Sequence, residues 1–530
     1  MTSNTSSFAK RLAVFKRPQV LKTLPQIKHG VERETLRINP KGTLSQTPHP
    51  TKLGAALTHD YITTDFSESL LEFITPPESD IKVTLNQLGD VHKFVMENIG
   101  NERLWPMSMP CFIDGEEDIP IAQYGSSNAG KMKTLYRVGL KNRYGSMMQA
   151  IAGVHFNFSF GDGFWQVWLQ EMEQQNADKD SISAAYFAMI RNYRRFCWLI
   201  PFLFGSSPAI CGSFIRGKKT NLPFKLLGKG THYLPYATSL RMSDLGYTNS
   251  EQSGLAICYN HVDSYINSLR KAINTPSEKY QKFAEKSNGA YRQLNANVLQ
   301  IENELYSPIR PKQPTQPLEK PTDALAKRGV SYIEVRALDV NPFSPVGITE
   351  EQFYFLDVFL AYCLVAPSEM MDENQYAETE RNLKAVVVNG RDPELRLHNH
   401  NEAVSLPQWS EQLFDEMREV AACLDQANNC QYYSAALEQQ WQKICDPSLT
   451  PSAKILDILL QKNFDNGALG VELAEQYRSQ LLTSDYALIS QDMFNQQAID
   501  SLAEQHRREQ LDDVSFDQFL AEYFSSSVTN

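Results

Sequence analysis

The side chains best suited to chemistry are carboxylates on segments that alternate like β-strands. Glu32 and Glu34 lie in KHGVERETLRIN, residues 28–39, and Pro40 and Gly42 close this segment. Successive side chains of a strand point to opposite faces, so the two glutamates share one face and repel each other. A hard divalent cation such as Mg²⁺ would remove that repulsion by binding their oxygens. From this strand alone, a solvated face with arginine partners is an equal alternative.

Two further predicted strands, residues 152–160 and 331–338, each have one apolar and one polar face. The polar face of the first carries His155 among small and polar residues, and that of the second carries Glu334 and Arg336. Taken alone, His155 is better explained as a hydrogen-bonded structural histidine, and an exposed Glu–Arg pair contributes little. The apolar faces opposite them indicate a half-buried sheet, so we interpret the polar side as the floor of a cleft.

Residues 57–75 contain two more strand-like pieces around a polar turn. Asp65 lies at this turn, and Glu72 stands between apolar residues of its strand, where a carboxylate requires a metal or an arginine as its partner. Together the four regions predict six metal ligands: Glu32, Glu34, Asp65, Glu72, His155 and Glu334. This number suits two or three divalent cations holding a polyphosphate, with the planar guanidinium of Arg336 contacting the transferred phosphate.

The elements that must position these residues form no regular strand–helix–strand rhythm, which favours an α+β fold. Helices are predicted over residues 80–99, 181–205, 251–274 and 350–366, and most of the remainder to about 525 is helical. Residues 101–145 have the irregular, glycine-rich composition of a substrate loop, and residues 306–322 carry five prolines and predict an extended surface connection. We expect a catalytic domain over 1–365 and a mainly helical region over 366–530.

The composition excludes several classes of protein. The 530 residues carry a net charge of −11, which argues against nucleic-acid binding. The eight cysteines include no CxxC pair, so we expect a reduced, cytoplasmic protein. No targeting segment is visible, and the most apolar run, residues 353–366, is too short to cross a bilayer and predicts a buried helix.

Three motifs that suggest a ligand site are rejected. GSSNAGK at 125–131 and GSFIRGK at 212–218 resemble phosphate-binding loops, but Met132 and Lys219 stand where such loops need Ser or Thr. Neither motif is predicted to join a buried strand to a helix. His398 and His400 could form a metal pair, but their polar context favours a surface loop.

Longer stretches resemble a known family. The sequence closely resembles the proteobacterial type of glutamate–cysteine ligase, and the likeness runs from about residue 28 to 350. The segments that carry it are GVERETLRIN, LTHDYITTDFSESLLEFITPP, RLWPMSMPC, TLYRVGLKNRYGSMMQ, IAGVHFNFSF, YLPYATSLRMSDLGYTN, NVLQIENELYSPIRPK and YIEVRALDVNPFSPVGI.

The resemblance implies a fold, a reaction and residue roles. The fold would be a curved, mostly antiparallel sheet forming an active-site funnel, related to glutamine synthetase, with helices packed outside. The family's metal positions fall on the six ligands named above, and its phosphate-binding position on Arg336; Glu334 and Arg336 are the expected catalytic pair. Its cysteine pocket falls on Phe66, Tyr136, Leu140, Gln149, Arg241 and Tyr247.

The implied reaction joins the γ-carboxylate of glutamate to the amine of cysteine. ATP, with two to three Mg²⁺ or Mn²⁺ ions, would first convert glutamate to γ-glutamyl phosphate, in the first step of glutathione biosynthesis. We expect a monomer, feedback by glutathione, and neither a nucleic-acid nor a membrane partner. The alternatives are a related ligase that uses another amine and a non-catalytic metal-binding scaffold. A bifunctional enzyme that also completes glutathione would need a further nucleotide-binding domain, for which residues 366–530 are too short.

Overall fold

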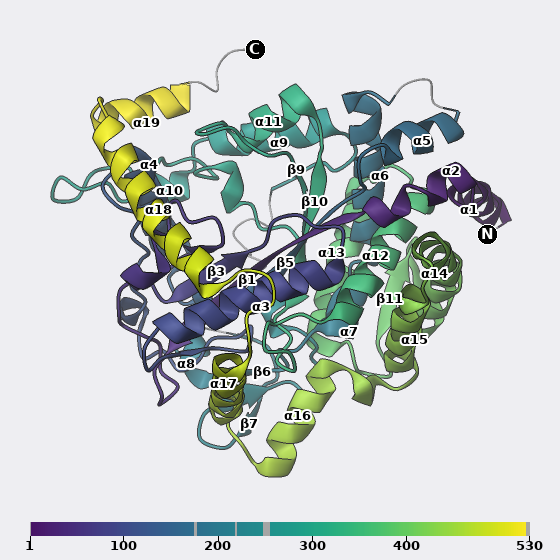
Figure 1. The fold of residues 1–530 in the computed structure, drawn as a ribbon. Helices are drawn as coiled ribbons and strands as arrows, with labels where there is room; N and C mark the ends of the chain where they lie inside the picture. The colour runs from purple at the N-terminus through teal and green to yellow at the C-terminus, as the bar shows by residue number, and fades with distance from the viewer. Residues whose placement is uncertain (1, 174–176, 218–219, 247–254, 526–530) are drawn as a thin grey trace.

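The computed structural model describes residues 2–173, 177–217, 220–246 and 255–525. It shows a mixed fold in which a seven-stranded antiparallel sheet lies among helices (Figure 1). The predicted α+β class is therefore confirmed. The strand order is β2–β3–β1–β5–β10–β9, and β4 pairs separately with β1. The strands are β1 (Lys28–Ile38), β2 (Ile62–Thr64), β3 (Leu70–Ile74), β4 (Arg103–Leu104), β5 (Gly153–Ser159), β9 (Ile309–Lys312) and β10 (Tyr332–Asp339).

The apolar face of the sheet is buried beneath helices. Phe156 of β5 contacts Phe353 of α12 (Glu350–Val365), with their ring centroids 5.1 Å apart. On the same face, Nε2 of His29 lies 2.8 Å from the carboxylate of Asp357, which gives this buried acidic side chain a partner. The segment from 353 to 365 is thus a core helix, as its composition predicts.

Further helices surround this core. The predicted helix over 80–99 is α3 (Ile81–Asn98), which begins after Asp80, whose side chain accepts a hydrogen bond from the backbone N–H of Lys82. The other helices of the first 365 residues are α1 (Thr2–Phe15), α2 (Pro18–Leu21), α4 (Asn128–Tyr144), α5 (Phe164–Glu171), α6 (Lys179–Phe196), α7 (Leu199–Phe204), α8 (Gly212–Ile215), α9 (Val262–Asn274), α10 (Glu278–Gln281) and α11 (Pro321–Arg328).

The C-terminal region is mainly helical, as predicted. Its helices are α13 (Glu373–Asn389), α14 (Leu406–Asn428), α15 (Tyr432–Cys445), α16 (Pro451–Lys462), α17 (Asn466–Thr483), α18 (Gln491–Leu511) and α19 (Phe516–Ser525). The main hydrophobic core continues into the C-terminal region, where the ring centroids of Phe355 of α12 and Phe414 of α14 are 6.3 Å apart. The division of the chain near residue 365 stays a prediction.

Two smaller sheets lie apart from the large one. Strands β6 (Ala209–Cys211), β7 (Lys225–Leu227) and β8 (Thr231–Tyr233) form one, and the hairpin of β11 (Arg396–Asn399) and β12 (Glu402–Ser405) forms the other. His398 lies in strand β11 and not in a loop, whereas His400 lies at the exposed turn of the hairpin, where a surface loop was predicted.

Two segments differ from the prediction in ways that matter for function. Residues 101–145 are not irregular throughout, because α4 occupies 128–144 and begins after Ser127, whose hydroxyl accepts a hydrogen bond from the N–H of Gly130. Residues 306–322 are not only a surface connection, because β9 joins the edge of the large sheet beside β10. An edge strand tolerates Pro311, since it pairs with only one neighbour and one of its sides needs no donors.

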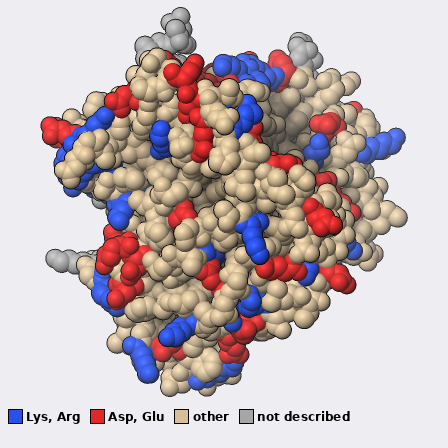
Figure 2. Space-filling model, turned by 60° about the vertical axis from the view of Figure 1, so that its left-hand side comes forward, with Lys and Arg blue, Asp and Glu red and all other residues tan. Residues whose placement is uncertain are grey.

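Acidic and basic side chains are interspersed on the face shown in Figure 2, which offers no broad basic stripe that would follow a nucleic-acid backbone. Among the described residues, no helix is both long enough and apolar enough to cross a bilayer.

Candidate active site

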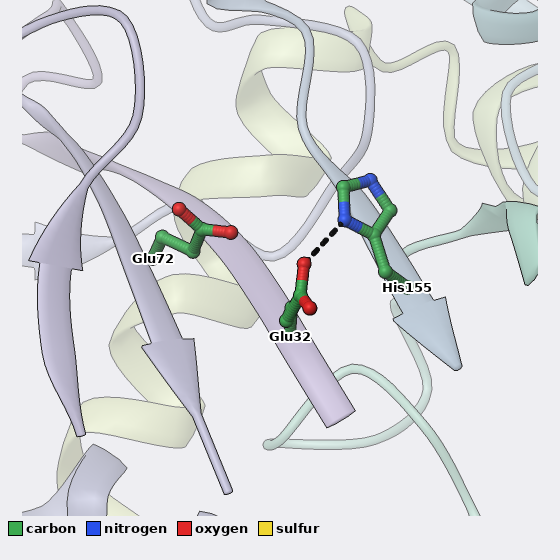
Figure 3. Close-up of side chains that lie close together, drawn as sticks. All are labelled: Glu32, Glu72 and His155. Carbon is green, nitrogen blue, oxygen red and sulfur yellow. Dashed lines mark hydrogen bonds and ion pairs between the residues drawn. The ribbon is translucent and has the colours of Figure 1, made fainter. Parts of the chain in front are cut away.

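The polar face of the large sheet gathers the carboxylates of three strands. Glu32 of β1 is in register with His155 of β5, and Glu34 of β1 is in register with Glu72 of β3. Residues paired across neighbouring strands share a face, so these side chains point to the same side. Figure 3 shows Glu32 and His155 in contact, with Glu72 pointing toward the same space from the neighbouring strand. The alternation in the sequence predicts this shared face correctly.

His155 lies at the centre of the cluster. Its Nδ1 is 3.0 Å from a carboxylate oxygen of Glu32 and 3.8 Å from one of Glu334, while its Nε2 is 3.7 Å from one of Glu34. Asn157 donates a hydrogen bond of 3.0 Å to the other oxygen of Glu32, and the backbone N–H of Gly153 donates one of 2.7 Å to Glu34. Glu32 and Glu34 are therefore held by their neighbours on β5.

The carboxylates of the cluster repel one another. Burial raises the pKa of Glu72 well above its usual range, and the nearby carboxylates of Glu32 and Asp65 raise it further. Burial likewise raises the pKa of Glu34. Two carboxylates that cannot both ionise without a cation between them are typical of a metal site.

The donor atoms fit a hard divalent cation. Ligand atoms of Glu32, Glu72 and His155 all lie within 4.8 Å of one another. In the described part of the chain, Oε2 of Glu334 and Nε2 of His155 are buried and make no hydrogen bond. Buried polar atoms without a partner are rare in proteins, and a bound ion or water can supply the missing partner. Carboxylate oxygens with one imidazole suit Mg²⁺ or Mn²⁺.

Glu334 and Arg336 of β10 border this cluster. Nη1 of Arg336 lies 3.0 Å from a carboxylate oxygen of Glu334, and Nζ of Lys312 lies 3.4 Å from the same oxygen. Burial acts to raise the pKa of Glu334, but Lys312, Arg336 and Arg310 hold it well below its usual range. Glu334 is thus a buried carboxylate that faces both His155 and a group of cations.

The residues predicted for the cysteine pocket line the same cavity as the carboxylates. This cavity has a volume of about 350 Å³, and Phe66, Tyr136, Leu140, Gln149 and Arg241 all line it, together with Asp65. Gln149 donates a hydrogen bond of 2.9 Å to the hydroxyl of Tyr306. Tyr247 lies outside the described residues. The structure brings the other predicted residues together, and their individual roles stay predictions.

Four cationic side chains of the cavity were missed by the sequence analysis. Lys133 and Arg137 project from α4, and Arg310 and Lys312 from β9. Arg310 and Lys312 have the same i, i+2 spacing as Glu32 and Glu34, but we dismissed their segment because of its prolines. The Lys133–Arg137–Leu140 spacing is that of a single helix face, which becomes visible only once α4 is recognised.

The rejected motif at 125–131 does open a helix, contrary to our expectation. The N–H groups at its start are occupied, however, because Ser126 donates a hydrogen bond of 2.7 Å to Glu509 and Asn128 donates one to Asp512. The anions at the start of α4 are therefore carboxylates of the chain itself. They occupy N–H groups that a phosphate would need, which supports the rejection of a phosphate-binding loop.

A second cavity adjoins the first. It has a volume of about 780 Å³, and Glu32 lines it too, together with Asn157. Its remaining lining is more apolar and includes Phe160, Trp165 and Tyr332. Glu32, which lines both cavities, marks the point where they meet.

Comparisons with known proteins identify the family of the chain. The sequence model of the glutamate–cysteine ligase family matches residues 12–386. A glutamate–cysteine ligase of Vibrio vulnificus (strain CMCP6) is 52% identical over 523 residues, which are 98% of each chain. One of Pseudoalteromonas translucida is 51% identical over 94% of this chain and 95% of its own.

Solved structures give the same result. A glutamate–cysteine ligase of Francisella tularensis in complex with AMP superposes with a TM-score of 0.88 at 36% identity, over 95% of this chain and 98% of its own. A bifunctional glutathione synthetase of Pasteurella multocida has a TM-score of 0.72 at 23% identity, and the match covers 93% of this chain and 58% of that one; this likeness concerns the fold alone.

The chain belongs to the glutamate–cysteine ligase family. The family expected from the sequence is confirmed, and with it an enzyme of the ligase class.

Proposed function

We propose that the chain catalyses ATP-dependent ligation of the γ-carboxylate of L-glutamate to the amine of L-cysteine, which gives γ-glutamylcysteine. The observation that carries the proposal is the cavity itself, because its lining combines a carboxylate cluster, the Glu334–Arg336 pair and five of the residues expected to bind cysteine. The glutamate–cysteine ligase names of the relatives supply the substrates, and the AMP-bound neighbour supports the use of an adenine nucleotide.

The proposed metal ligands are Glu32, Glu34, Asp65, Glu72, His155 and Glu334, which would hold two to three Mg²⁺ or Mn²⁺ ions. When bound, these ions supply positive charge against the triphosphate and the transferred phosphoryl group. Their binding would also offset the repulsion that raises the pKa values of Glu34 and Glu72.

Arg336 provides a permanent positive charge beside Glu334 and His155. A glutamate carboxylate is a poor electrophile, so it must first become an acyl phosphate, γ-glutamyl phosphate, with release of ADP. The guanidinium of Arg336, held 3.0 Å from Glu334, is placed to contact oxygens of the phosphoryl group in both this step and the later loss of phosphate. Attack by the cysteine amine on the acyl phosphate then forms the amide.

The cysteine pocket combines apolar and cationic side chains. Phe66 and Leu140 are buried and offer an apolar surface for a small thiol side chain. Arg241 offers a cation for the substrate carboxylate from the same cavity.

The second cavity is our candidate site for the adenosine part of the nucleotide. Its aromatic side chains, Phe160, Trp165 and Tyr332, suit a planar base. Because Glu32 lines both cavities, a triphosphate held at the carboxylate cluster would connect a base in the second cavity with substrates in the first. The polar and apolar division of the antiparallel sheet also supports the expected funnel and the relation to glutamine synthetase. Monomeric state, glutathione feedback and cytoplasmic location stay predictions.

The test is formation of γ-glutamylcysteine by the purified protein. We expect release of ADP and product when glutamate, cysteine, ATP and Mg²⁺ are all present, and a loss of activity when EDTA is added. A panel of other amines in place of cysteine tests the alternative substrate. The proposal fails if cysteine does not stimulate ADP release above the level with glutamate alone, or if another amine is preferred.

A further inference from the structure

Helices α18 and α19 contact the two segments that lead to Phe66, Tyr136 and Leu140, three of the residues predicted for the cysteine pocket. Helices α18 and α19 run along one side of the molecule, and in Figure 1 they are the yellow helices near α4. We call them the C-terminal brace, residues 491–525. None of the residues that line the active-site cavity belongs to the brace, so its contribution to the site is indirect.

The first contact of the brace holds the segment that leads into β2. Ser501 of α18 accepts a hydrogen bond of 2.9 Å from the backbone N–H of Ala55, and its carbonyl accepts one of 2.6 Å from the hydroxyl of Thr58. Gly54 adopts a φ of +78°, and a Cβ there would lie 2.3 Å from the Ser501 hydroxyl oxygen. The chain then passes through β2 to Phe66, so the brace anchors one wall of the pocket.

The second contact holds the start of α4, the helix that forms the other wall. Glu509 accepts a hydrogen bond of 2.7 Å from the N–H of Ser126, and Asp512 accepts one from the N–H of Asn128. These donors lie at a helix start, where N–H groups have no partner within the helix and where negative charge is favourable. The side chain of Asn128 adds a bond of 3.0 Å to the carbonyl of Val514.

The third contact is a small hydrophobic cluster that is separate from the main core. Leu520 of α19 packs there with Met132 and Leu135 of α4 and with Leu294. Leu140, which lines the cavity from the same helix, belongs to the main core instead. The main core thus supports one side of α4, while the other side depends on the brace.

We propose that the C-terminal brace positions the two walls of the cysteine pocket, and that Ser501 and Asp512 are positioning residues that set the KM for cysteine. The inference rests on the proposed function, because it takes Phe66 and Tyr136 as cysteine-pocket residues. Five of the six proposed metal ligands lie on β1, β3, β5 and β10, and none of the hydrogen bonds of the brace given above reaches these strands. The sixth, Asp65, adjoins Phe66 on a wall that the brace supports. Binding of ATP is therefore expected to depend less on the brace than binding of cysteine.

The test compares Asp512→Ala with its neighbour Asp513→Ala in the full-length protein. Both side chains are exposed acids of the same link, but only Asp512 receives the N–H of Asn128. We expect Asp512→Ala to raise the KM for cysteine about tenfold, the size that loss of one charge-assisted hydrogen bond produces. We expect kcat and the KM for ATP to stay near the parent values, while the melting temperature falls slightly because the N–H of Asn128 loses its acceptor. Asp513→Ala should match the parent throughout, and Asp512→Glu, which keeps the acceptor, should restore the KM.

A second variant and a second measurement make the result decisive. Ser501→Ala removes the side-chain acceptor for the N–H of Ala55 on the segment that leads to Phe66, and it should also raise the KM for cysteine. Amide hydrogen exchange, which needs no turnover, should accelerate over residues 128–144 in Asp512→Ala. The proposal is overturned if α4 exchanges at the parent rate, if neither variant changes the KM for cysteine, or if all kinetic constants worsen in step with the melting temperature. A parent protein that makes no γ-glutamylcysteine would refute the proposed function separately.

Discussion

Replacing Glu72 with glutamine separates the repulsion within the carboxylate cluster from the metal binding that we propose for it. The ligand atoms of Glu32 and Glu72 lie no more than 4.8 Å apart. Two full negative charges at this distance repel each other by about 3 kcal/mol at an effective dielectric constant of about 20. The raised pKa of Glu72 shows that protonation offers partial relief. Without divalent cations we therefore expect Glu72→Gln to stabilise the protein by about 1 kcal/mol, a fraction of the full repulsion.

With divalent cations the effect should reverse. A ligand present at about 100 times its Kd stabilises the folded state by about 3 kcal/mol, and the variant lacks one anionic ligand for it. Thermal unfolding in EDTA should thus give a melting temperature about 1 °C above that of the parent. The rise in melting temperature on adding Mg²⁺ should be smaller in the variant than in the parent, and kcat should fall.

Glu68→Gln is a matched control on the turn between β2 and β3. Both carboxylate oxygens of Glu68 accept backbone hydrogen bonds of 2.6 Å, from His49 and Gln123. Its replacement should lower the melting temperature equally with and without Mg²⁺, because it removes a structural acceptor and no metal ligand. Our reasoning would be refuted if Glu72→Gln destabilised the protein in EDTA or kept the full response to Mg²⁺.

Three further predictions concern Glu334, Arg336 and His92. Glu334→Gln should lower kcat about 10²–10³-fold at saturating Mg²⁺, since it keeps the side-chain size but removes the charge; near-normal turnover would exclude Glu334 as a ligand. Arg336→Lys should lower kcat at least about tenfold, because an ammonium does not reproduce the planar fork; an unchanged kcat would argue against its phosphate contact. Burial, reinforced by the charge of Arg33, lowers the pKa of His92 to about 3. Stability tied to His92 is therefore complete above about pH 6.5, the unfolded value, and is lost as the pH falls toward 3. In chemical unfolding between pH 4 and 6, His92→Phe should reduce the slope of stability against pH by up to about 1.4 kcal/mol per unit, and an unchanged slope would contradict the cause assigned.

The polar floor of the site could be predicted because strand alternation is a local property. The shared faces of residues 28–39 and 152–160 follow from the chain alone, and the structure confirms both. The pairs Glu32–His155 and Glu34–Glu72 could not be predicted in the same way, since they depend on the register between strands distant in sequence. Their assignment to metal and phosphate came from the family resemblance, because repeated carboxylates on a sheet face are equally compatible with arginine partners.

The proline-rich segment shows how a correct local rule can hide a functional strand. Prolines usually argue against a central strand, and residues 306–322 contain five of them. The rule does not exclude an edge strand, and β9 occupies the edge beside β10 with Pro311 opposite Ile333. For this reason Arg310 and Lys312 were not predicted as residues of the site, although they help to hold the pKa of Glu334 low.

Helix α4 was missed for a different physical reason. Sequence periodicity reveals a helix when one face meets a core and the other meets water. The cavity-facing side of α4 carries Lys133 and Arg137 beside apolar residues, while Met132 and Leu135 pack against the C-terminal brace. Apolar residues therefore lie on both sides of α4, and they form no single stripe along the helix. Because a helix enclosed between an active site and a supporting element loses this signal, the sequence is least informative at the element that shapes the proposed substrate pocket.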